Sequence, residues 1–305
     1  MGTRKKVLGD SNLEGFLFAL PWILGFLLFS VYPIFMSGYY SFTNFSAIRK
    51  PVWVGWDNYK FLFEEPLFYR SLYNTFRYVA FAVPLSIVLA LFLASLLNMK
   101  IRGQSFFRSI FFLPSVVPSV AATMIWIWML EPLGGFINRF LRVFGIPGFN
   151  WLGHPLYTMP SVIIITLWGV GTTVIIFLAA MQDVPKELYE SAEIDGAGRL
   201  SKFFYITIPG ISHMILYQVI LGIINGFQVF TQVYIIITSQ AGVLKSALGG
   251  GPGDSLLMYP LYLYQNAFGL LRMGRAAAMA WILFLIVGII TLILIKTTKR
   301  HIAIQ

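Results

Sequence analysis

Four amide side chains recur along an uncharged stretch in the second half of the chain. They are Gln218, Asn225, Gln228 and Gln232, and their spacings of 7, 3 and 4 residues place them on one face of a helix. An amide both donates and accepts hydrogen bonds, and an unpaired amide in hydrocarbon is costly. The pattern therefore predicts either hydrogen bonds between helices or a polar lining in which Asn225, Gln228 and Gln232 meet the hydroxyl groups of a ligand.

Aromatic side chains accompany these amides. Trp168 and Tyr234 are candidates for packing against a ligand ring in the same lining. Most aromatic residues in so apolar a chain face lipid or anchor at the membrane surface. A structural role for both residues therefore stays open beside the ligand-binding one.

A second chemically distinctive segment is the polar loop 182–210, which holds five of the 12 acidic residues. We expect a short helix capped by Asp183 and ended by Gly196 in a left-handed conformation. A second short helix, 199–206, should stop before Pro209. Small residues on one side would allow another surface to approach closely. The alternative is an ordinary solvated loop whose acids are surface charge.

Several kinds of chemistry are absent from the sequence. There is no phosphate-binding loop, no zinc-protease or serine-hydrolase motif, and no cysteine. His154, His213 and His301 are far apart, which argues against a metal site. No ionisable residue lies in the middle of a predicted span, whereas carriers that couple transport to ions usually place one there. The sequence therefore disfavours both an enzyme and a self-contained secondary carrier.

The composition indicates the class of protein, and hence the kind of secondary structure that holds these residues. Of the 305 residues 58% are hydrophobic and only 11% are charged, and the mean hydropathy is +0.77. A soluble surface needs more polar side chains, so we expect an all-α integral membrane protein. The net charge of +10 comes from basic residues placed mostly between uncharged runs, which indicates membrane topology and not nucleic-acid binding.

Six transmembrane helices are predicted, because each long uncharged run can supply the roughly 20 apolar residues that cross a bilayer. One set of flanks carries 12 basic residues in 61 positions and the other 9 in 98, so the first set, with both termini and the loop 182–210, is assigned to the cytoplasm. Residues 255–271 are short and interrupted, and can be re-entrant, amphipathic or spanning. The predicted spans are 13–37, 75–98, 108–130, 157–181, 211–238 and 276–295, in a single domain 1–305.

The loop 182–210 also carries a resemblance to a known family. Glu190-Ser191-Ala192, then Gly196, then Ile206-x-Ile208-Pro209 resembles the E-A-A-x3-G-x9-I-x-L-P loop of permeases of ABC importers, with Ser for Ala and Ile for Leu as mild departures. The resemblance extends along nearly the whole chain and is closest to carbohydrate permeases. Its other segments are Val54-Gly55-Trp56-Asp57-Asn58-Tyr59, Asn74-Thr75, Phe111-Phe112-Leu113-Pro114, Gly250-Gly251-Pro252-Gly253 and Tyr264-Gln265-Asn266-Ala267-Phe268.

The resemblance implies a function for this loop and a set of partners. It implies a coupling helix between the fourth and fifth spans that docks on a separate ATPase subunit through Glu190, Ala192, Asp195, Gly196 and Ala197. It further implies a second, homologous permease chain, two ATPase subunits that bind the ATP and magnesium, and an extracytoplasmic solute-binding protein. The chain itself would hold no cofactor.

The function expected from the resemblance is uptake of a sugar or oligosaccharide across a bacterial or archaeal cell membrane. Uptake of a polyol or glycerol phosphate is the nearest alternative. A membrane assembly or anchoring protein without a transport path is a more distant one. Which sugar is carried, and whether this chain contacts it, cannot be read from these residues.

Overall fold

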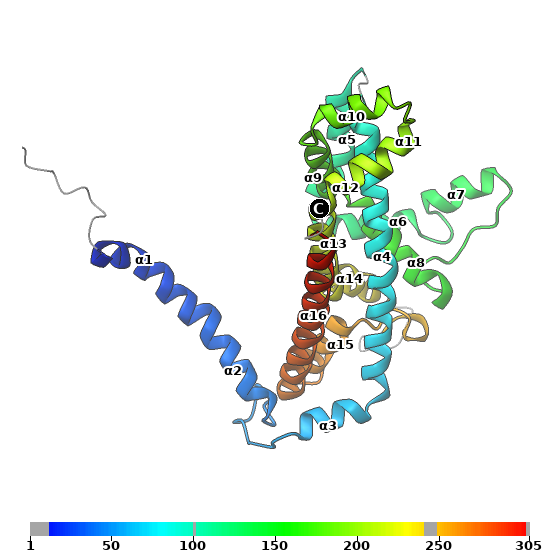
Figure 1. Ribbon diagram of the computed structural model, residues 1–305. Coiled ribbons are helices and arrows are strands. Elements are labelled where there is room, and N and C mark those ends of the chain that lie inside the picture. The colour runs from blue at the N-terminus through cyan, green and yellow to red at the C-terminus, as the bar shows by residue number, and fades with distance from the viewer. Residues whose placement is uncertain (1–11, 100–101, 241–248, 303–305) are drawn as a thin grey trace, which may run out of the picture. The chain divides into compact units, whose positions relative to one another are not determined.

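The computed structural model describes residues 12–99, 102–240 and 249–302, and within these it is built from helices (Figure 1). Helices suit a lipid environment because they satisfy every backbone hydrogen bond internally. The described residues fall into two compact units. The first contains residues 12–64 and 266–282, and the second contains 65–265 and 283–302. The prediction of a single domain stays a prediction.

In the first unit, α1 (Asn12–Phe26), a π-helical turn (Leu27–Val31) and α2 (Tyr32–Ser41) form a continuous apolar stretch. A loop with two isolated β-bridges leads to α3 (Asp57–Glu64). The amino end of α16 (Met273–Ile302) packs on this loop, because Gly274 donates its backbone N–H to Phe45 O at 3.1 Å. A Cβ at Gly274 would lie 2.0 Å from the Thr43 carbonyl oxygen, so glycine alone permits this approach.

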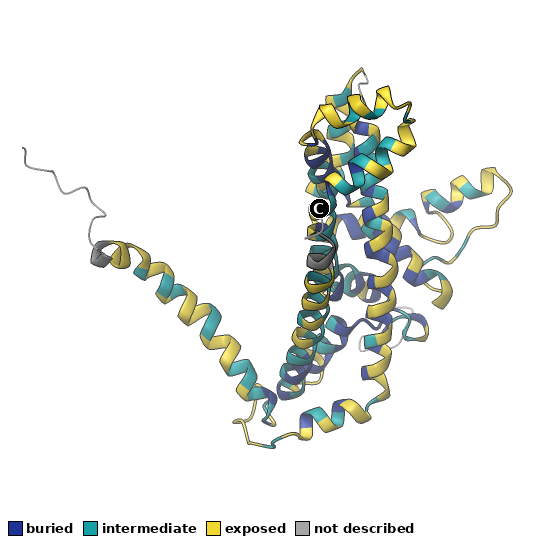
Figure 2. Cartoon of the chain, in the orientation of Figure 1, coloured by how far each residue is buried: buried dark blue, intermediate teal, exposed yellow. Residues whose placement is uncertain are grey.

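The second unit is organised around α4 (Pro66–Asn98), whose buried face follows a helical period and is lined with small residues such as Ala82, Ala90 and Ala94. This face packs against five other helices of the unit. Exposed and buried residues alternate along α4 accordingly (Figure 2). The helices that pack on it are α5 (Gln104–Val116), α8 (Pro155–Trp168), α9 (Gly171–Gln182), α13 (Ser212–Phe227) and α15 (Tyr259–Tyr264).

Four described helical stretches are long and apolar enough to cross a membrane, and the count reaches six if each of two bent pairs is one span. The four are Gly15–Ser41, Pro66–Asn98, Ser212–Gln240 and Met273–Thr297. They match the predicted spans 13–37, 75–98, 211–238 and 276–295 in place. The second begins nine residues earlier than predicted, because Arg70 and Arg77 are accommodated within α4.

The predicted spans 108–130 and 157–181 are not straight helices, which corrects the expectation. The first divides into α5 and α6 (Ser119–Met129), which are bent by 98°. The break lies at Val117, because the following Pro118 disfavours a helical conformation there. The second divides into α8 and α9, bent by 49° at Gly169 and Val170. Between the two pairs, α7 (Phe136–Val143) is anchored by the buried amide of Asn138.

The stretch 211–238 also contains an interruption that the sequence did not predict. Helix α13 ends at Phe227 and α14 (Thr231–Gln240) begins four residues later. The residues 228–230 between them are not helical. Helical spacing therefore cannot be counted across this break.

The loop 182–210 contains the expected short helix, α10 (Lys186–Ile194), followed by α11 (Arg199–Lys202), a π-helical turn (Phe203–Thr207) and α12 (Ile208–Gly210). Two details of the prediction are wrong. Asp183 ends α9 instead of capping α10, because Pro185 is the residue that directly precedes α10. The backbone also stays helical through Pro209, because proline is tolerated near the start of a helix. Figure 1 places α10 to α12 together at one end of the second unit.

Residues 255–271 do not form a membrane-crossing helix. Helix α15 (Tyr259–Tyr264) continues as a π-helical turn (Gln265–Gly269), and this helical stretch rises only about 16 Å. The chain leading into it is buried on α4, where Asn74 Nδ2 donates to Asp254 O at 2.7 Å and to Leu257 O at 3.1 Å. Thr75 Oγ1 accepts from the backbone N–H of Tyr259 at 2.8 Å. The Asn74-Thr75 pair thus holds a buried segment against α4 in the second unit.

Candidate functional site

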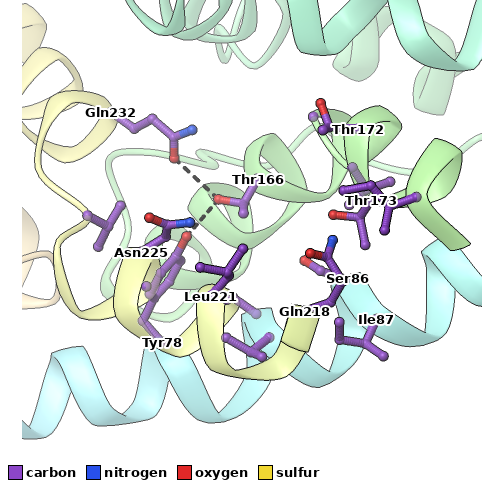
Figure 3. Close-up of a pocket in the computed structure, with 18 residues that line it drawn as sticks. Tyr78, Ser86, Ile87, Thr166, Thr172, Thr173, Gln218, Leu221, Asn225 and Gln232 are labelled. Carbon is purple, nitrogen blue, oxygen red and sulfur yellow. Dashed lines mark hydrogen bonds between the residues drawn. The ribbon is translucent and has the colours of Figure 1, made fainter. Parts of the chain in front are cut away.

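A cavity of about 450 Å³ lies between α4, the α8–α9 pair and the α13–α14 pair (Figure 3). Every residue of the described chain that lines it is uncharged. Amides reach it from one side, at Gln218, Asn225 and Gln232. Hydroxyl groups reach it from α4, α8 and α9, at Tyr78, Ser86, Thr166, Thr172 and Thr173.

A chain of hydrogen bonds crosses one end of this cavity. Thr166 Oγ1 lies 3.2 Å from Gln232 Oε1 and 3.0 Å from Val162 O, and its one hydrogen serves these two acceptors. Because the single Thr166 hydrogen is then used, the Tyr78 hydroxyl is the donor in its 2.8 Å contact with Thr166 Oγ1. Figure 3 shows Thr166 between the other two side chains. The network joins α4, α8 and α14, and so ties three helices together at the cavity.

Close helix packing forms the wall between α4 and α13. A Cβ at Gly222 would lie 3.1 Å from Val83 Cγ1, and one at Gly226 would lie 3.0 Å from Val79 Cγ2. Glycines four residues apart let two membrane helices approach closely. This Gly-x-x-x-Gly pattern was a sequence signal for the position of α13 that our sequence analysis did not use.

The predicted path residues divide into two groups in the structure. Asn225 and Gln232 line the cavity, together with Gln218 from the same amide pattern. Gln228 is exposed and absent from the lining, because it follows the last residue of α13 and lies in the non-helical break. The prediction that all four amides share one helix face is therefore wrong: Gln228 lies in the break, and Gln232 reaches the cavity from a second helix, α14.

Trp168 and Tyr234 are not brought to the cavity either. Trp168 makes an edge contact with Trp126, with ring centroids 6.1 Å apart. Tyr234 packs against Phe230 at 5.2 Å and Tyr264 at 5.3 Å. On α14, Tyr234 lies two residues and therefore about 200° from Gln232, so the two side chains point to opposite sides of the helix.

The cavity also contains residues that the sequence analysis missed. Tyr78 and Thr166 are 88 residues apart, and they lie in different helices. No local pattern marks them. Only the packing of α4 on α8 brings the two hydroxyl groups together.

The carboxyl end of α10 has the conformation that the sequence predicted. Gly196 has a φ of +77°. Its N–H donates to Glu193 O at 3.1 Å, and the Ala197 N–H donates to Ala192 O at 2.8 Å. These two bonds form the turn that commonly ends a helix at glycine. The prediction for Gly196 is confirmed at the level of the backbone.

Two side-chain contacts brace α10 against the segment that follows it. The Tyr189 hydroxyl lies 2.9 Å from Thr207 Oγ1. The Lys202 ammonium lies 3.3 Å from the Glu193 carboxylate, and the Lys202 side chain is only 17% exposed. The contacts join residues 18 and 9 positions apart. The segment is therefore a braced unit and not a flexible connection.

The outer surface of this braced unit is open. Glu190, Asp195 and Gly196 are exposed, and Ala192 and Ala197 are half-buried. Ala192 and Asp195 line a shallow hollow of about 390 Å³ with Leu188 and Tyr205. Large apolar side chains accompany the acids, and Ile194 is 88% exposed. The sequence analysis missed Ile194 as a contact candidate. Figure 2 shows how much of α10 and α11 is exposed.

Together, the apolar helices, the uncharged polar cavity and the braced polar segment define a multi-spanning membrane protein of the transport class. The chain belongs to the family described as binding-protein-dependent transport system inner membrane component, whose model matches residues 83–301. It is therefore a multi-pass inner-membrane permease of an ABC transporter that works with a binding protein, and not an enzyme.

Individual relatives agree with this family. The probable ABC transporter permease protein YesP of Bacillus subtilis (strain 168) is 38% identical over 299 residues, covering 97% of this chain and 94% of YesP. The arabinooligosaccharides transport system permease protein AraP of the same organism is 31% identical over 284 residues, covering 92% of this chain and 87% of AraP.

A solved structure shares the fold. It is a bacterial ABC transporter involved in the import of the acidic polysaccharide alginate, one chain of which superposes with a TM-score of 0.77 at 22% identity. The match covers 97% of this chain and 99% of that chain. The expected all-helical membrane fold is thereby confirmed.

Proposed function

We propose that this chain forms part of the path by which an ATP-driven importer takes up a neutral sugar or oligosaccharide. The observation that carries the proposal is the uncharged cavity lined by amides and hydroxyl groups. Such groups donate and accept hydrogen bonds as sugar hydroxyls require. The likeness to AraP, a permease for arabinooligosaccharides, supports the same substrate class.

The size and charge of the cavity support a small neutral ligand. Its volume of about 450 Å³ falls within the roughly 300–1,000 Å³ typical of small-molecule sites. A phosphorylated or carboxylated substrate would enter without a basic partner in the described lining, and an unpaired charge there is costly. A neutral polyol remains the second candidate substrate, and glycerol phosphate is disfavoured by the same argument.

A direct connection links the cavity to the segment 182–210. Thr172 and Thr173 of α9 line the cavity, and α9 ends at Gln182, about 14 Å further along the helix axis from Thr173. The helix α10 follows after three residues. Because α9 is a helix throughout, a displacement of α10 is expected to move the wall of the cavity.

Docking of the ATPase subunit is proposed at the exposed face of this segment. Glu190, Ala192, Asp195, Gly196 and Ala197 are the proposed contacts, with Glu190 as the partner of a basic residue. The exposed Ile194 adds an apolar side chain that would be buried on docking. In this proposal ATP and magnesium are bound by two ATPase subunits, and a second permease chain completes the path.

The orientation of the chain belongs to the same proposal. The density of basic residues puts the segment 182–210 and both termini in the cytoplasm. The terminal residues 1–11 and 303–305 lie outside the described residues. The binding protein would then deliver its ligand on the opposite side of the membrane.

The substrate proposal is tested with amide variants of the cavity. Cells carrying Gln218→Leu or Gln232→Leu are assayed for uptake of a panel of radiolabelled neutral oligosaccharides and polyols. Each lost hydrogen bond is worth about 0.5–1.5 kcal/mol, so uptake at low substrate should fall roughly 3- to 10-fold. Gln228→Leu, an exposed amide outside the lining, is the matched control and should transport normally. Equal uptake in all three variants would exclude this cavity from the path.

The docking proposal is tested by reversing one charge. Glu190→Lys should abolish co-purification of the ATPase subunit or its substrate-stimulated ATP turnover, because a basic partner would be repelled. Glu64→Lys, at an exposed carboxylate of α3 outside this segment, is the matched control and should keep both. Gly196→Val should also weaken docking, since a side chain at a φ of +77° is strained by about 1 kcal/mol or more. Normal coupling in Glu190→Lys and Gly196→Val would refute docking here.

A further inference from the structure

A rigid hairpin directly follows the first candidate span. Residues 42–44 pair with 52–54, through an Asn44 N–H to Val52 O bond of 2.8 Å and a Val54 N–H to Phe42 O bond of 2.9 Å. The buried Asn58 amide donates to Ser41 O at 2.8 Å and Thr43 O at 2.9 Å. These bonds satisfy the backbone at the base of the hairpin. Its tip is therefore held in place and presented as a preformed surface.

Aromatic rings cover one part of this hairpin. Phe42 stacks on Trp53 with ring centroids 5.6 Å apart, and meets the edge of Trp56 at 5.0 Å. Tyr59 closes the group at 5.4 Å from Phe42. Although they are packed together, Trp53 is 60% and Trp56 is 63% exposed. Both indoles thus have one side in contact with the cluster and one side open.

The tip of the hairpin combines apolar and basic side chains. Ile48 is 78% exposed, Val52 is 63% exposed, and Arg49 and Lys50 stand between them. A turn in which the Arg49 N–H donates to Ser46 O at 3.2 Å fixes the tip. An exposed apolar side chain on each side of two cations is the pattern of a surface that meets both hydrocarbon and phosphate.

The position of the hairpin relative to the bilayer follows from chain continuity. The candidate span Gly15–Ser41 ends one residue before Phe42. Tyr39, in the last turn of that span, lies 6.0 Å from Trp53 between ring centroids. The tryptophans are therefore level with the end of a membrane helix, where Trp and Tyr are enriched in membrane proteins.

We propose that the hairpin 42–54 is a membrane anchor that binds anionic phospholipid headgroups through Arg49 and Lys50, with Ile48, Trp53 and Trp56 at the headgroup–acyl boundary. The charge complementarity and the continuity with the span both favour lipid. The anchor would fix the outer end of the first span in depth and rotation. It acts independently of the substrate that the transporter carries.

The depth of the tip is measured with a single label, because the chain contains no cysteine. Ile48→Cys in the full-length chain is spin-labelled in lipid nanodiscs, and its collision rates with oxygen and with a water-soluble nickel chelate are compared. Val88→Cys, 65% exposed on α4, is the lipid reference, and Glu187→Cys on α10 is the water reference. The ratio of the oxygen collision rate to the nickel collision rate at the Ile48 label should be higher than at the water reference and lower than at the lipid reference. Nickel access equal to that of the Glu187 label would overturn the anchor.

The headgroup preference is measured with a fluorophore at the same cysteine, quenched by doxyl-labelled phosphatidylglycerol or phosphatidylcholine. Phosphatidylglycerol should be preferred, by roughly fivefold for each basic residue at low salt, and the preference should shrink as salt is raised. Arg49→Gln with Lys50→Gln should remove it, whereas Lys60→Gln, an exposed lysine outside the hairpin, should not. Equal quenching by both lipids would refute headgroup binding. If the label is shielded from the water-soluble nickel chelate only when the solute-binding protein is added, the tip would instead be a contact surface for that protein.

Discussion

Replacing Gly171 by alanine should loosen the contact between the two bent helix pairs. Gly171 is the first residue of α9, and its backbone lies against that of α5. A Cβ there would lie 2.3 Å from Phe111 O and 2.9 Å from Phe112 Cα. Carbon–oxygen contacts in proteins rarely fall below about 3.3 Å, so the two helices would have to separate by about 1 Å. Overpacking of this kind costs roughly 1–3 kcal/mol.

The assay for this prediction is thermal unfolding of the purified full-length chain, followed by size-exclusion chromatography. The cost of about 1–3 kcal/mol, at about 2–4 °C of Tm for each kcal/mol, means that Gly171→Ala should lower the Tm by roughly 2–12 °C. Gly169→Ala is a matched control in the same break. Its Cβ would meet only Thr166 O at an ordinary 3.5 Å, and its φ of −90° suits alanine, so its Tm should equal or slightly exceed that of the parent. Equal stability of the two variants would refute the α5–α9 contact.

Three further predictions concern other parts of the chain. Asn74→Ala removes the donor from the buried Leu257 carbonyl and the part-buried Asp254 carbonyl, and should lower the unfolding free energy by about 1–3 kcal/mol in a denaturant titration. An unchanged midpoint would contradict the buried segment. Tyr189→Phe removes the hydroxyl contact with Thr207, and should lower uptake per ATP hydrolysed in vesicles while the ATPase subunit still co-purifies. The backbone N–H groups of Gly134 and Leu133 lower the pKa of Glu131. The Glu131 carboxylate therefore stabilises the fold fully above the unfolded pKa of about 4.3, and this stabilisation disappears as pH falls through the lowered folded-state pKa. The Tm difference between the parent and Glu131→Gln should be present at neutral pH and vanish in acid.

The sequence predicted those features that depend on residues close together in the chain, namely the positions of the helices and the end of α10. Uncharged runs located the helices, since the hydrocarbon requirement acts on each run separately. Gly196 marked the end of α10, because a left-handed residue at a helix end strongly favours glycine. Pro118 is of a residue type that often interrupts a helix. The predicted span 108–130 nevertheless ran through it, because a proline within a membrane helix is often accommodated.

What could not be predicted depends on packing between distant segments. The Tyr78–Thr166 pair needs α4 and α8 to be neighbours, and no spacing within either helix reveals that contact. The displacement of Gln228 from the amide face depends on a break at 228–230 that contains no proline or glycine. Trp168 and Tyr234 were chosen by residue type alone. In the structure their rings pack against Trp126 and Tyr264 and do not line the cavity.

Transport by the reconstituted complex tests the central claim most directly. This chain, its second permease and the ATPase subunits are assembled in vesicles that contain ATP, with binding protein and radiolabelled neutral oligosaccharide outside. The proposed function predicts accumulation that requires ATP, binding protein and this chain together, and that Glu190→Lys abolishes. Accumulation that proceeds without the ATPase subunits under an ion gradient, or without this chain, would contradict it.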